Sequence, residues 1–447
     1  MTFKEIVYSP CGIRYCFDSL DLQSGYARQL LLESEMMTDR AAIQANYSSL
    51  KDYVTLIERD TTLVQNVQFK LQGLRDITAT LQSLEDGTLL DDIEFFEIKY
   101  LAMLGDDIQR LFSGASVQWR QFDLDRAIQI LDPEGLRIGT FYIYDAYSMD
   151  LRGYRKSLEA DPDNDELKDM IEKEESRIKK VLCNLLRPYA DHLKQLLKAL
   201  AELDIFLAKA YQMQKEGYVI PTVGESAAFK GLFHPQVKAV LEDAGREFQN
   251  VDFSYEMGLP STVIGANMGG KTVVLKTLTL CQYLFQFGFA VPAVSCTMMV
   301  FDQIYFCIGD EQNQQKGLSS FAAEMLRIDS VLKAVESGDR ILALVDEPAR
   351  TTNPIEGRAL VSALLKILEA RHNLAFILTT HYNVENGGKC WRVKGLIEKS
   401  KGVEGLKMDY SLLRTESNQV PHEALNIATE LGINSQWLDE AKRYLEK

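Results

Sequence analysis

Eight consecutive residues near the middle of the chain combine glycines with a Lys-Thr pair at the spacing of a phosphate-binding loop. The segment 265–272 reads GANMGGKT, which fits the pattern GxxxxGK[ST]. An apolar strand is expected before it over 262–264, and a helix is expected from Val273 onward. A chance glycine-rich turn is the alternative, but it would not explain this flanking context. We therefore predict that the nucleotide phosphates are held by Gly265, Ala266, Asn267, Met268, Gly269, Gly270, Lys271 and Thr272.

A second apolar run, 341–345, ends in a pair of carboxylates. Asp346 at the end of a buried strand can hold the shell of a Mg²⁺ ion, together with the hydroxyl of Thr272. Glu347 is then placed to orient or deprotonate an attacking water. Lys271 is expected to reach the β- and γ-phosphates. The sequence therefore predicts an ATP hydrolase that uses ATP and Mg²⁺, with Lys271, Glu347 and His381 in catalytic roles.

Two further segments carry candidate residues. The run LAFILTTHY predicts a third buried strand that ends at His381, in the position where ABC-type ATPases keep a histidine that senses the γ-phosphate. The run KGLSS, with Ser319, opens an amphipathic helix. Ser319 is either an ordinary helix cap or a donor to ATP that is bound by a second subunit.

The elements around these residues divide the chain into three parts. Residues 1–230 have mostly helical periodicity, with a helix start at Thr38-Asp39 and one or two long helices over 163–214. Short apolar runs then alternate with helical segments over 231–415, which is typical of a parallel α/β sheet. Residues 416–447 are again helical and are expected to mediate dimerisation.

Composition limits the class of protein. The chain has 447 residues, a formal net charge of −15 and seven scattered cysteines, without the Cys and His spacing of a zinc site. Dedicated duplex-DNA binders usually carry an excess of Lys and Arg, so the acidic charge favours a protein or small-molecule target. The absence of a long apolar run and of a signal-peptide core predicts a cytoplasmic protein without a membrane partner.

Together these segments resemble the DNA mismatch repair MutS family of ABC-type ATPases. The loop GANMGGKT is similar to that family's GPNMGGKS, and GFAVPA, FDQIYFCIGDEQNQQKGLSSFAAEM, LVDEPARTTNPIEG and LTTHY follow in the family's order. The resemblance implies an all-α core and lever domain, a P-loop ATPase domain and a C-terminal helical segment. It also implies that Ser319 acts across a dimer, that Asp346 and Glu347 are the Walker B pair, and that His381 is the switch histidine. The family places a stacking aromatic near Phe248.

Departures from the family pattern concern the target and the signalling across the dimer. The resemblance predicts a shortened form without the mismatch-recognition and connector domains, because the sequence begins where the family's core begins. Phe95-Phe96-Glu97 reads as the core of an amphipathic helix rather than as a mismatch wedge. The clamp between the levers reduces to little more than the turn at 161–164. Ala349-Arg350-Thr351 replaces the family's Gly-Arg-Gly after the carboxylate pair.

Two functions follow from the resemblance. In the favoured one, a homodimer, or a heterodimer with a related subunit, remodels a protein client, as in the MutS-like ATPase subunit of the reactivase that serves adenosylcobalamin-dependent lysine 5,6-aminomutase. In the alternative, the levers grip duplex, mismatched or branched DNA in DNA repair.

Overall fold

The chain forms two compact units that alternate along the sequence. Unit 1 comprises residues 1–20, 35–48 and 212–447, and unit 2 comprises residues 21–34 and 49–211. The predicted domain boundaries at 230 and 415 stay a prediction. The computed structural model describes residues 1–265, 269–308, 320–369, 371–384, 388–397, 407–415, 425, 428–429 and 432–445.

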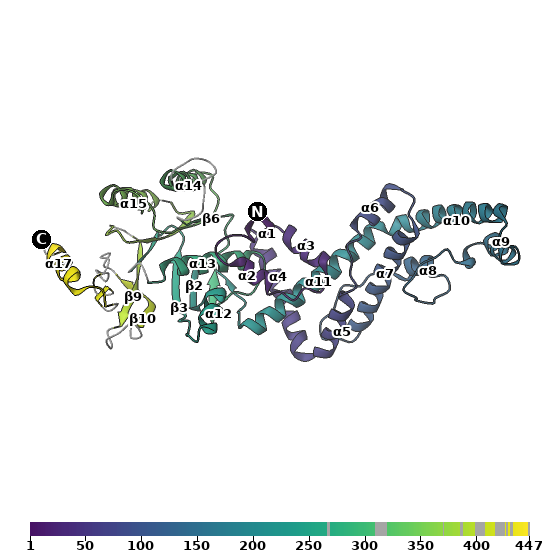
Figure 1. The fold of residues 1–447 in the computed structure, drawn as a ribbon, viewed down its shortest axis with the longest axis horizontal. Helices are drawn as coiled ribbons and strands as arrows, with labels where there is room; N and C mark the ends of the chain where they lie inside the picture. Colours follow the sequence, from purple (N-terminus) through teal and green to yellow (C-terminus); the bar gives the residue numbers. More distant parts are fainter. Residues whose placement is uncertain are drawn as a thin grey trace. The chain divides into compact units, whose positions relative to one another are not determined.

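Unit 2 is built from helices, drawn in purple to teal in Figure 1. Asp91 caps one of its long helices, α7, by accepting the Glu94 N–H at 2.8 Å. Phe95 in that helix is fully buried, so its predicted place in a helix core is confirmed. The helices are α3 (Gly25–Glu33), α5 (Thr61–Leu71), α6 (Thr78–Asp86), α7 (Asp92–Phe112), α8 (Asp125–Leu131), η1 (Asp145–Tyr147), α9 (Met149–Ala160), α10 (Asp165–Leu186) and η2 (Arg187–Tyr189), with parts of α4 (Arg40–Arg59) and α11 (Ala190–Glu216).

Two predicted helical segments can be compared with the structure in detail. The helix expected at Thr38-Asp39 is α4, and its cap is Asp39, whose carboxylate accepts the Ala42 N–H at 2.7 Å. Residues 163–214 form two helices, α10 and most of α11, separated by the short turn η2. Pro188 in this turn lacks the N–H that a continuous helix would need.

Unit 1 contains both sheets of the described residues. One has four strands in the order β1 (Thr222–Val223), β5 (Ser295–Met298), β2 (Ser226–Leu232) and β3 (Val251–Glu256). The other has six strands in the order β10 (Lys407–Thr415), β9 (Lys389–Ile397), β4 (Ser261–Ile264), β8 (Leu374–Thr380), β7 (Ile341–Val345) and β6 (Gln303–Cys307). Neighbouring strands from β9 to β6 are parallel, and β10 is antiparallel to β9.

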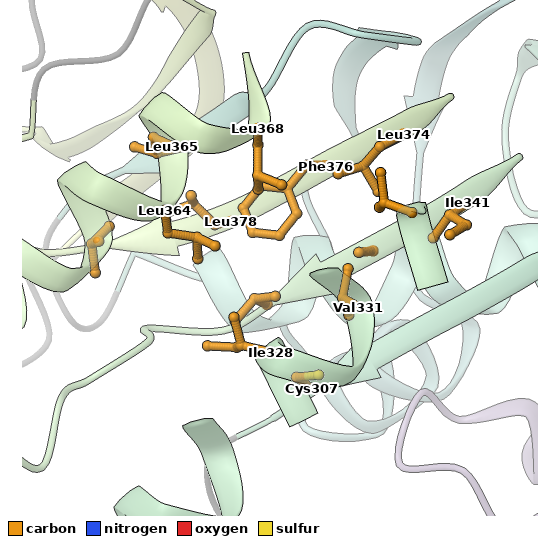
Figure 2. Packing of buried hydrophobic residues seen from close by; sticks show 14 of the residues in the cluster. Cys307, Ile328, Val331, Ile341, Leu364, Leu365, Leu368, Leu374, Phe376 and Leu378 are labelled. Atoms are coloured by element: carbon orange, nitrogen blue, oxygen red, sulfur yellow. The ribbon is translucent and has the colours of Figure 1, made fainter. Parts of the chain in front are cut away.

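Helices cover both faces of the six-stranded sheet. Leu364, Leu365 and Leu368 of α15 and Ile328 and Val331 of α14 pack on one face of β6, β7 and β8 (Figure 2). Alternate residues of β7 and β8 point to the other face, where α13 contacts both strands. Strands β4, β7 and β8 are buried throughout, as expected for parallel strands between helical layers. The helices of unit 1 are α1 (Phe3–Ile6), α2 (Ile13–Asp18), α12 (Pro235–Asp243), α13 (Lys271–Gln286), α14 (Ser320–Val335), α15 (Pro354–Leu368) and α17 (Ser435–Leu445).

The first residues of the chain belong to the core of unit 1. The Phe3 ring lies 5.1 Å from the Phe287 ring and 5.7 Å from the Phe289 ring. The Tyr47 hydroxyl donates to the carbonyl oxygens of Phe285 at 3.0 Å and Phe289 at 2.8 Å. The N-terminal segment therefore anchors the end of α13.

The predicted order of a helical region followed by mixed α/β sheets is confirmed. In the part of the chain that the structure describes, no helix is both long enough and apolar enough to cross a membrane.

Candidate nucleotide-binding site

Three neighbouring parallel strands bring the predicted site residues to one edge of the sheet. Gly265 follows β4, Asp346 follows β7, and His381 follows β8. The observed strands match those predicted from the apolar runs, except that β4 begins one residue earlier, at Ser261, and β8 ends one residue earlier than predicted, at Thr380. The carboxyl ends of parallel strands are the usual position of ligand sites in open α/β sheets.

The phosphate-binding loop connects β4 to α13. Gly270 caps α13 in a left-handed conformation (φ 76°), and a Cβ at this position would come within 3.3 Å of the Tyr410 ring. Both features favour glycine, since a side chain here would be strained and crowded. The helix begins at Lys271, two residues before the predicted start at Val273. Ala266, Asn267 and Met268 lie outside the described residues.

Lys271 is buried at the base of the loop. Its Nζ donates to the Gly265 carbonyl oxygen at 2.9 Å and lies 3.1 Å from Glu347 Oε1. Only 3% of the Lys271 side chain is exposed. A buried ammonium group needs such partners, because an unpaired charge would not be tolerated there. Two of the three residues predicted to be catalytic, Lys271 and Glu347, are thus in direct contact.

Thr272 and Asp346 are joined through their side chains. The Thr272 hydroxyl donates to Asp346 Oδ2 at 2.8 Å. The Thr379 hydroxyl donates to Asp346 Oδ1 at 2.6 Å and accepts the Glu347 N–H at 2.9 Å. Thr379, from β8, therefore orients both carboxylate residues that follow β7, although sequence reasoning did not identify it.

The oxygen donors here fit a Mg²⁺ ion that arrives with a nucleotide. Mg²⁺ takes oxygen ligands and is usually bound by one or two carboxylates together with substrate phosphates and water. Thr272 and Asp346 supply a hydroxyl and a carboxylate 2.8 Å apart. The described residues contain no group of three or more His, Cys, Asp or Glu side chains that could hold a metal without the nucleotide. Thr272 and Asp346 are therefore the protein groups that would hold Mg²⁺.

Glu347 occupies an unusual backbone conformation. Its φ is 44°, and that of Ala349 is 60°, a region that residues other than glycine rarely adopt. Each such residue costs about 1–3 kcal/mol and persists only where the surroundings hold it. Arg350 lies 3.5 Å from Glu347 Oε2. The Glu347 carboxylate therefore lies between two cations, Lys271 within the site and Arg350 at its rim.

His381 lies directly after β8, with its ring 4.2 Å from the ring of Tyr382. Burial lowers the pKa of the imidazole, the charge of Glu347 opposes this, and the charges of Lys271 and Arg350 act in the same direction as burial. The neutral form of His381 is therefore favoured, and it can both donate and accept a hydrogen bond.

An apolar pocket of about 330 Å³ adjoins the loop. Phe248 and Tyr410 supply aromatic walls, and Gly269 and Gly270 form the side next to the phosphate loop. The Gln249 side chain holds Tyr410 in place by accepting its backbone N–H at 2.8 Å. A mainly apolar pocket with two aromatic side chains in its lining suits a nucleotide base. Phe248 was expected from the resemblance, whereas Tyr410 was not.

Ser319 lies outside the described residues, so its predicted contact across a dimer stays a prediction. The described helix that follows it, α14, contributes a residue that sequence reasoning missed. Glu324 accepts the Ala349 N–H at 3.2 Å through Oε2. Glu324 and Thr379 lie within the segments FAAEM and LTTHY that carry the resemblance, but nothing local singles out either residue or Tyr410, because each is far in the sequence from the group that it contacts.

Comparison with known proteins shows what the part of the chain that carries the site is similar to. Residues 261–444 match the family model described as MutS domain V. The chain is also similar to proteins named Endonuclease MutS2. That of Clostridium beijerinckii is 30% identical over 303 residues, or 64% of this chain and 36% of the relative. That of Shouchella clausii is 32% identical over 296 residues, or 63% of this chain and 36% of the relative.

The chain thus spans about a third of the length of the curated relatives that it matches. A relative from Streptococcus sanguinis is 35% identical over a shorter stretch of 210 residues. The chain is therefore similar to proteins named MutS2 over about two thirds of its own length, and its residues 261–444 are similar to MutS domain V.

Proposed function

We propose that this chain is a MutS-type ATPase that binds ATP with Mg²⁺, hydrolyses it, and uses the nucleotide cycle to control binding to DNA. One observation carries the enzymatic part: Lys271, Thr272, Asp346 and Glu347 converge at the carboxyl edge of three parallel strands. The phosphate loop and Lys271 bind the phosphates, Thr272 and Asp346 hold the metal ion, and Glu347 orients or deprotonates water.

The Glu347→Gln variant tests the enzymatic part. The amide keeps the size of the side chain but cannot accept a proton, so we expect hydrolysis to fall by about a hundredfold or more. Binding of ATP should remain, because Lys271 and the loop are unchanged. Steady-state phosphate release and equilibrium binding of a fluorescent ATP analogue measure the two effects. Normal turnover in this variant would exclude Glu347 as the general base.

The proposal of a DNA target is supported by the names of the relatives, since an endonuclease acts on nucleic acid. Because the match covers about a third of those proteins, their nuclease activity is not part of the proposal. We propose instead that ATP closes a dimer and that hydrolysis reopens it, so that the helices of unit 2 act as levers on duplex or branched DNA.

Charge favours a second candidate, a protein client. The net charge is −15, and α9 and α10 carry acidic residues interleaved with basic ones rather than a basic stripe. DNA affinity depends mainly on Lys and Arg contacts to phosphates. Remodelling of a protein such as adenosylcobalamin-dependent lysine 5,6-aminomutase is therefore the alternative function.

Fluorescence anisotropy with labelled homoduplex, mismatched and branched DNA separates the two targets. Each DNA is titrated with the full chain in the presence of ADP or a non-hydrolysable ATP analogue, at moderate salt. Submicromolar binding that depends on the nucleotide supports DNA as the target. If none of the DNAs is bound while ATP is hydrolysed, the DNA proposal is wrong, and the Glu347→Gln variant becomes the bait for a protein client.

A further inference from the structure

The segment that carries Glu347 forms a strained turn at the end of β7. Glu347 and Ala349 both have left-handed φ values, of 44° and 60°. Ala349 is fully buried, so its N–H and carbonyl oxygen need partners inside the protein. An L-residue leaves this conformation readily unless its surroundings hold it. The direction of the Glu347 carboxylate therefore depends on the groups that hold this turn.

Three side chains hold the turn through hydrogen bonds. The Thr379 hydroxyl accepts the Glu347 N–H at 2.9 Å, and the Tyr382 hydroxyl donates to the Ala349 carbonyl oxygen at 2.9 Å. Both belong to β8 or follow it directly, next to β7 in the same sheet. The third, Glu324, accepts the Ala349 N–H at 3.2 Å and comes from a different layer, helix α14.

The position of Glu324 is fixed by the packing of its own helix. Ile328 and Val331, one and two turns further along α14, are buried against β6, β7 and β8, as Figure 2 shows. Burial raises the pKa of the Glu324 carboxyl, and the charges of Arg350 and Arg327 oppose this shift. The Glu324 carboxyl is partly buried and accepts the Ala349 N–H, so it holds that amide in one position.

We propose that Glu324 is a positioning residue for ATP hydrolysis: by holding the Ala349 amide it fixes the left-handed turn, and through that turn it directs the Glu347 carboxylate. The inference rests on the proposed function. It also means that the position of α14 affects hydrolysis. A movement of this helix relative to β7 changes the Glu324–Ala349 hydrogen bond, while Lys271 and the phosphate loop stay in place.

The test compares Glu324→Ala with Glu324→Gln in the full chain. Alanine removes the acceptor, so we expect kcat to fall by roughly tenfold to a hundredfold, as for a small misplacement of a reacting group. The dissociation constant of a non-hydrolysable ATP analogue should change by less than about twofold, because no group that contacts the nucleotide is altered. Glutamine keeps an acceptor oxygen and should restore most of the activity.

Two controls separate positioning from general destabilisation. Asp329→Ala removes a carboxylate of the same helix that forms an ion pair only one turn away, with Lys333 at 2.6 Å, and should leave kcat unchanged. Ala349→Gly makes the turn less dependent on the hydrogen bond from Glu324, since glycine adopts φ near 60° without strain. The loss of activity caused by Glu324→Ala should therefore be several-fold smaller in the Ala349→Gly background.

Unchanged kcat in Glu324→Ala would overturn the inference, and so would an equal loss of activity with and without Ala349→Gly. Hydrogen exchange gives a readout that does not require turnover: peptides covering 346–352 should exchange faster in Glu324→Ala than in the wild type, and equal exchange would also overturn it. A wild-type chain that binds ATP but does not hydrolyse it would instead contradict the proposed function.

Discussion

At the scale of single residues, the candidate site is a set of contacts between groups that are distant in the sequence. Lys271 and Glu347 are 3.1 Å apart in space, although 76 positions separate them along the chain. The phosphate loop and the carboxylate pair could be predicted, because each is a local pattern that follows an apolar run. Their supporting residues could not. Thr379, Glu324 and Tyr410 are ordinary residue types in ordinary elements, and only the tertiary fold brings them to the site.

Tyr410 gives a prediction about nucleotide affinity. It faces the apolar pocket beside Gly270 and provides a flat surface for a base. Stacking of a base on an aromatic ring contributes about 1–3 kcal/mol, so Tyr410→Ala should weaken ATP binding by roughly tenfold. Isothermal titration with ATP and ADP measures the change. Phe69→Ala, which removes an exposed aromatic ring in unit 2, is the control and should leave affinity unaltered. Unchanged binding by Tyr410→Ala would exclude this pocket as the base site.

At the scale of elements, strands and helices were predictable where the hydrophobic pattern was local and continuous. The runs before the Lys-Thr pair and the carboxylate pair became β4 and β7, because short, mainly apolar runs of this length suit strands buried on both faces. The turn at Ala349 was not predictable, since nothing in an alanine indicates a left-handed conformation. The order of the strands in the sheet could not be predicted from the sequence either, because β4 lies between β8 and β9, which come more than a hundred residues later.

A buried ion pair in unit 2 gives a prediction about stability. Lys99 of α7 donates to Asp132 Oδ1 at 3.1 Å and to the Tyr144 hydroxyl at 2.9 Å, and both charged side chains are almost fully buried. Lys99→Met leaves the Asp132 carboxylate without its countercharge, so we expect the free energy of unfolding to fall by about 3–5 kcal/mol.

Urea-induced unfolding measures this loss. The matched control is Lys70→Met, which removes the partly exposed pair between Lys70 and Asp107 and should cost less than about 1 kcal/mol. The double variant Lys99→Met/Asp132→Asn should recover part of the loss, because an uncharged amide replaces the stranded carboxylate. If Lys99→Met lowers the free energy of unfolding no more than Lys70→Met does, the buried ion pair does not contribute strongly to stability.

The start of α12 gives a prediction about pH. His234 Nε2 lies 3.1 Å from the Cys11 carbonyl oxygen, and Nδ1 accepts the Val237 N–H at 3.4 Å, an arrangement that fits the neutral ring. Burial lowers the pKa of His234 to about 4. The contribution of neutral His234 to the free energy of unfolding is complete above a pH of about 6.5, the pKa that the imidazole has in the unfolded chain. This contribution is lost as the pH falls from there toward 4, because the unfolded chain then binds the proton more readily.

We therefore expect unit 1 to lose about 2 kcal/mol from this group between pH 7.5 and pH 5. Thermal unfolding over this range measures the effect. His234→Gln lacks the titrating group, so its stability should depend less on pH. If the two pH profiles have the same slope, His234 does not titrate as its burial indicates.

At the scale of the whole molecule, the proposed cycle requires a dimer in which each ATP is completed by the partner subunit. The resemblance to the MutS family assigns this contact to Ser319, and mixing two inactive variants tests it. Ser319→Ala and Lys271→Ala should each hydrolyse little ATP alone. A mixed dimer contains one site with both residues intact, so mixing should restore part of the wild-type activity.

Recovery of phosphate release after mixing, at concentrations where the subunits exchange, is the expected outcome. The control is Lys271→Ala mixed with Lys271→Ala/Ser319→Ala, in which no site has both residues. Full activity of Ser319→Ala alone would reduce Ser319 to a helix cap. Two inactive variants whose mixture remains inactive would place Ser319 in the same subunit as the nucleotide that it serves.

The packing of Phe3 and Tyr47 against the end of α13 has a consequence for synthesis on the ribosome. The first fifty residues emerge long before residues 285–289, which cover them in the finished protein. At 5–20 residues per second, about 12–50 seconds pass between the two events. During that time Phe3 can contact Phe17 but lacks Phe287 and Phe289, and Tyr47 lacks its carbonyl partners. The nascent chain therefore exposes apolar surface of the kind that chaperones bind. All residues of unit 2 have by then been synthesised, so unit 2 can fold before the N-terminal segment makes its contacts with residues 285–289.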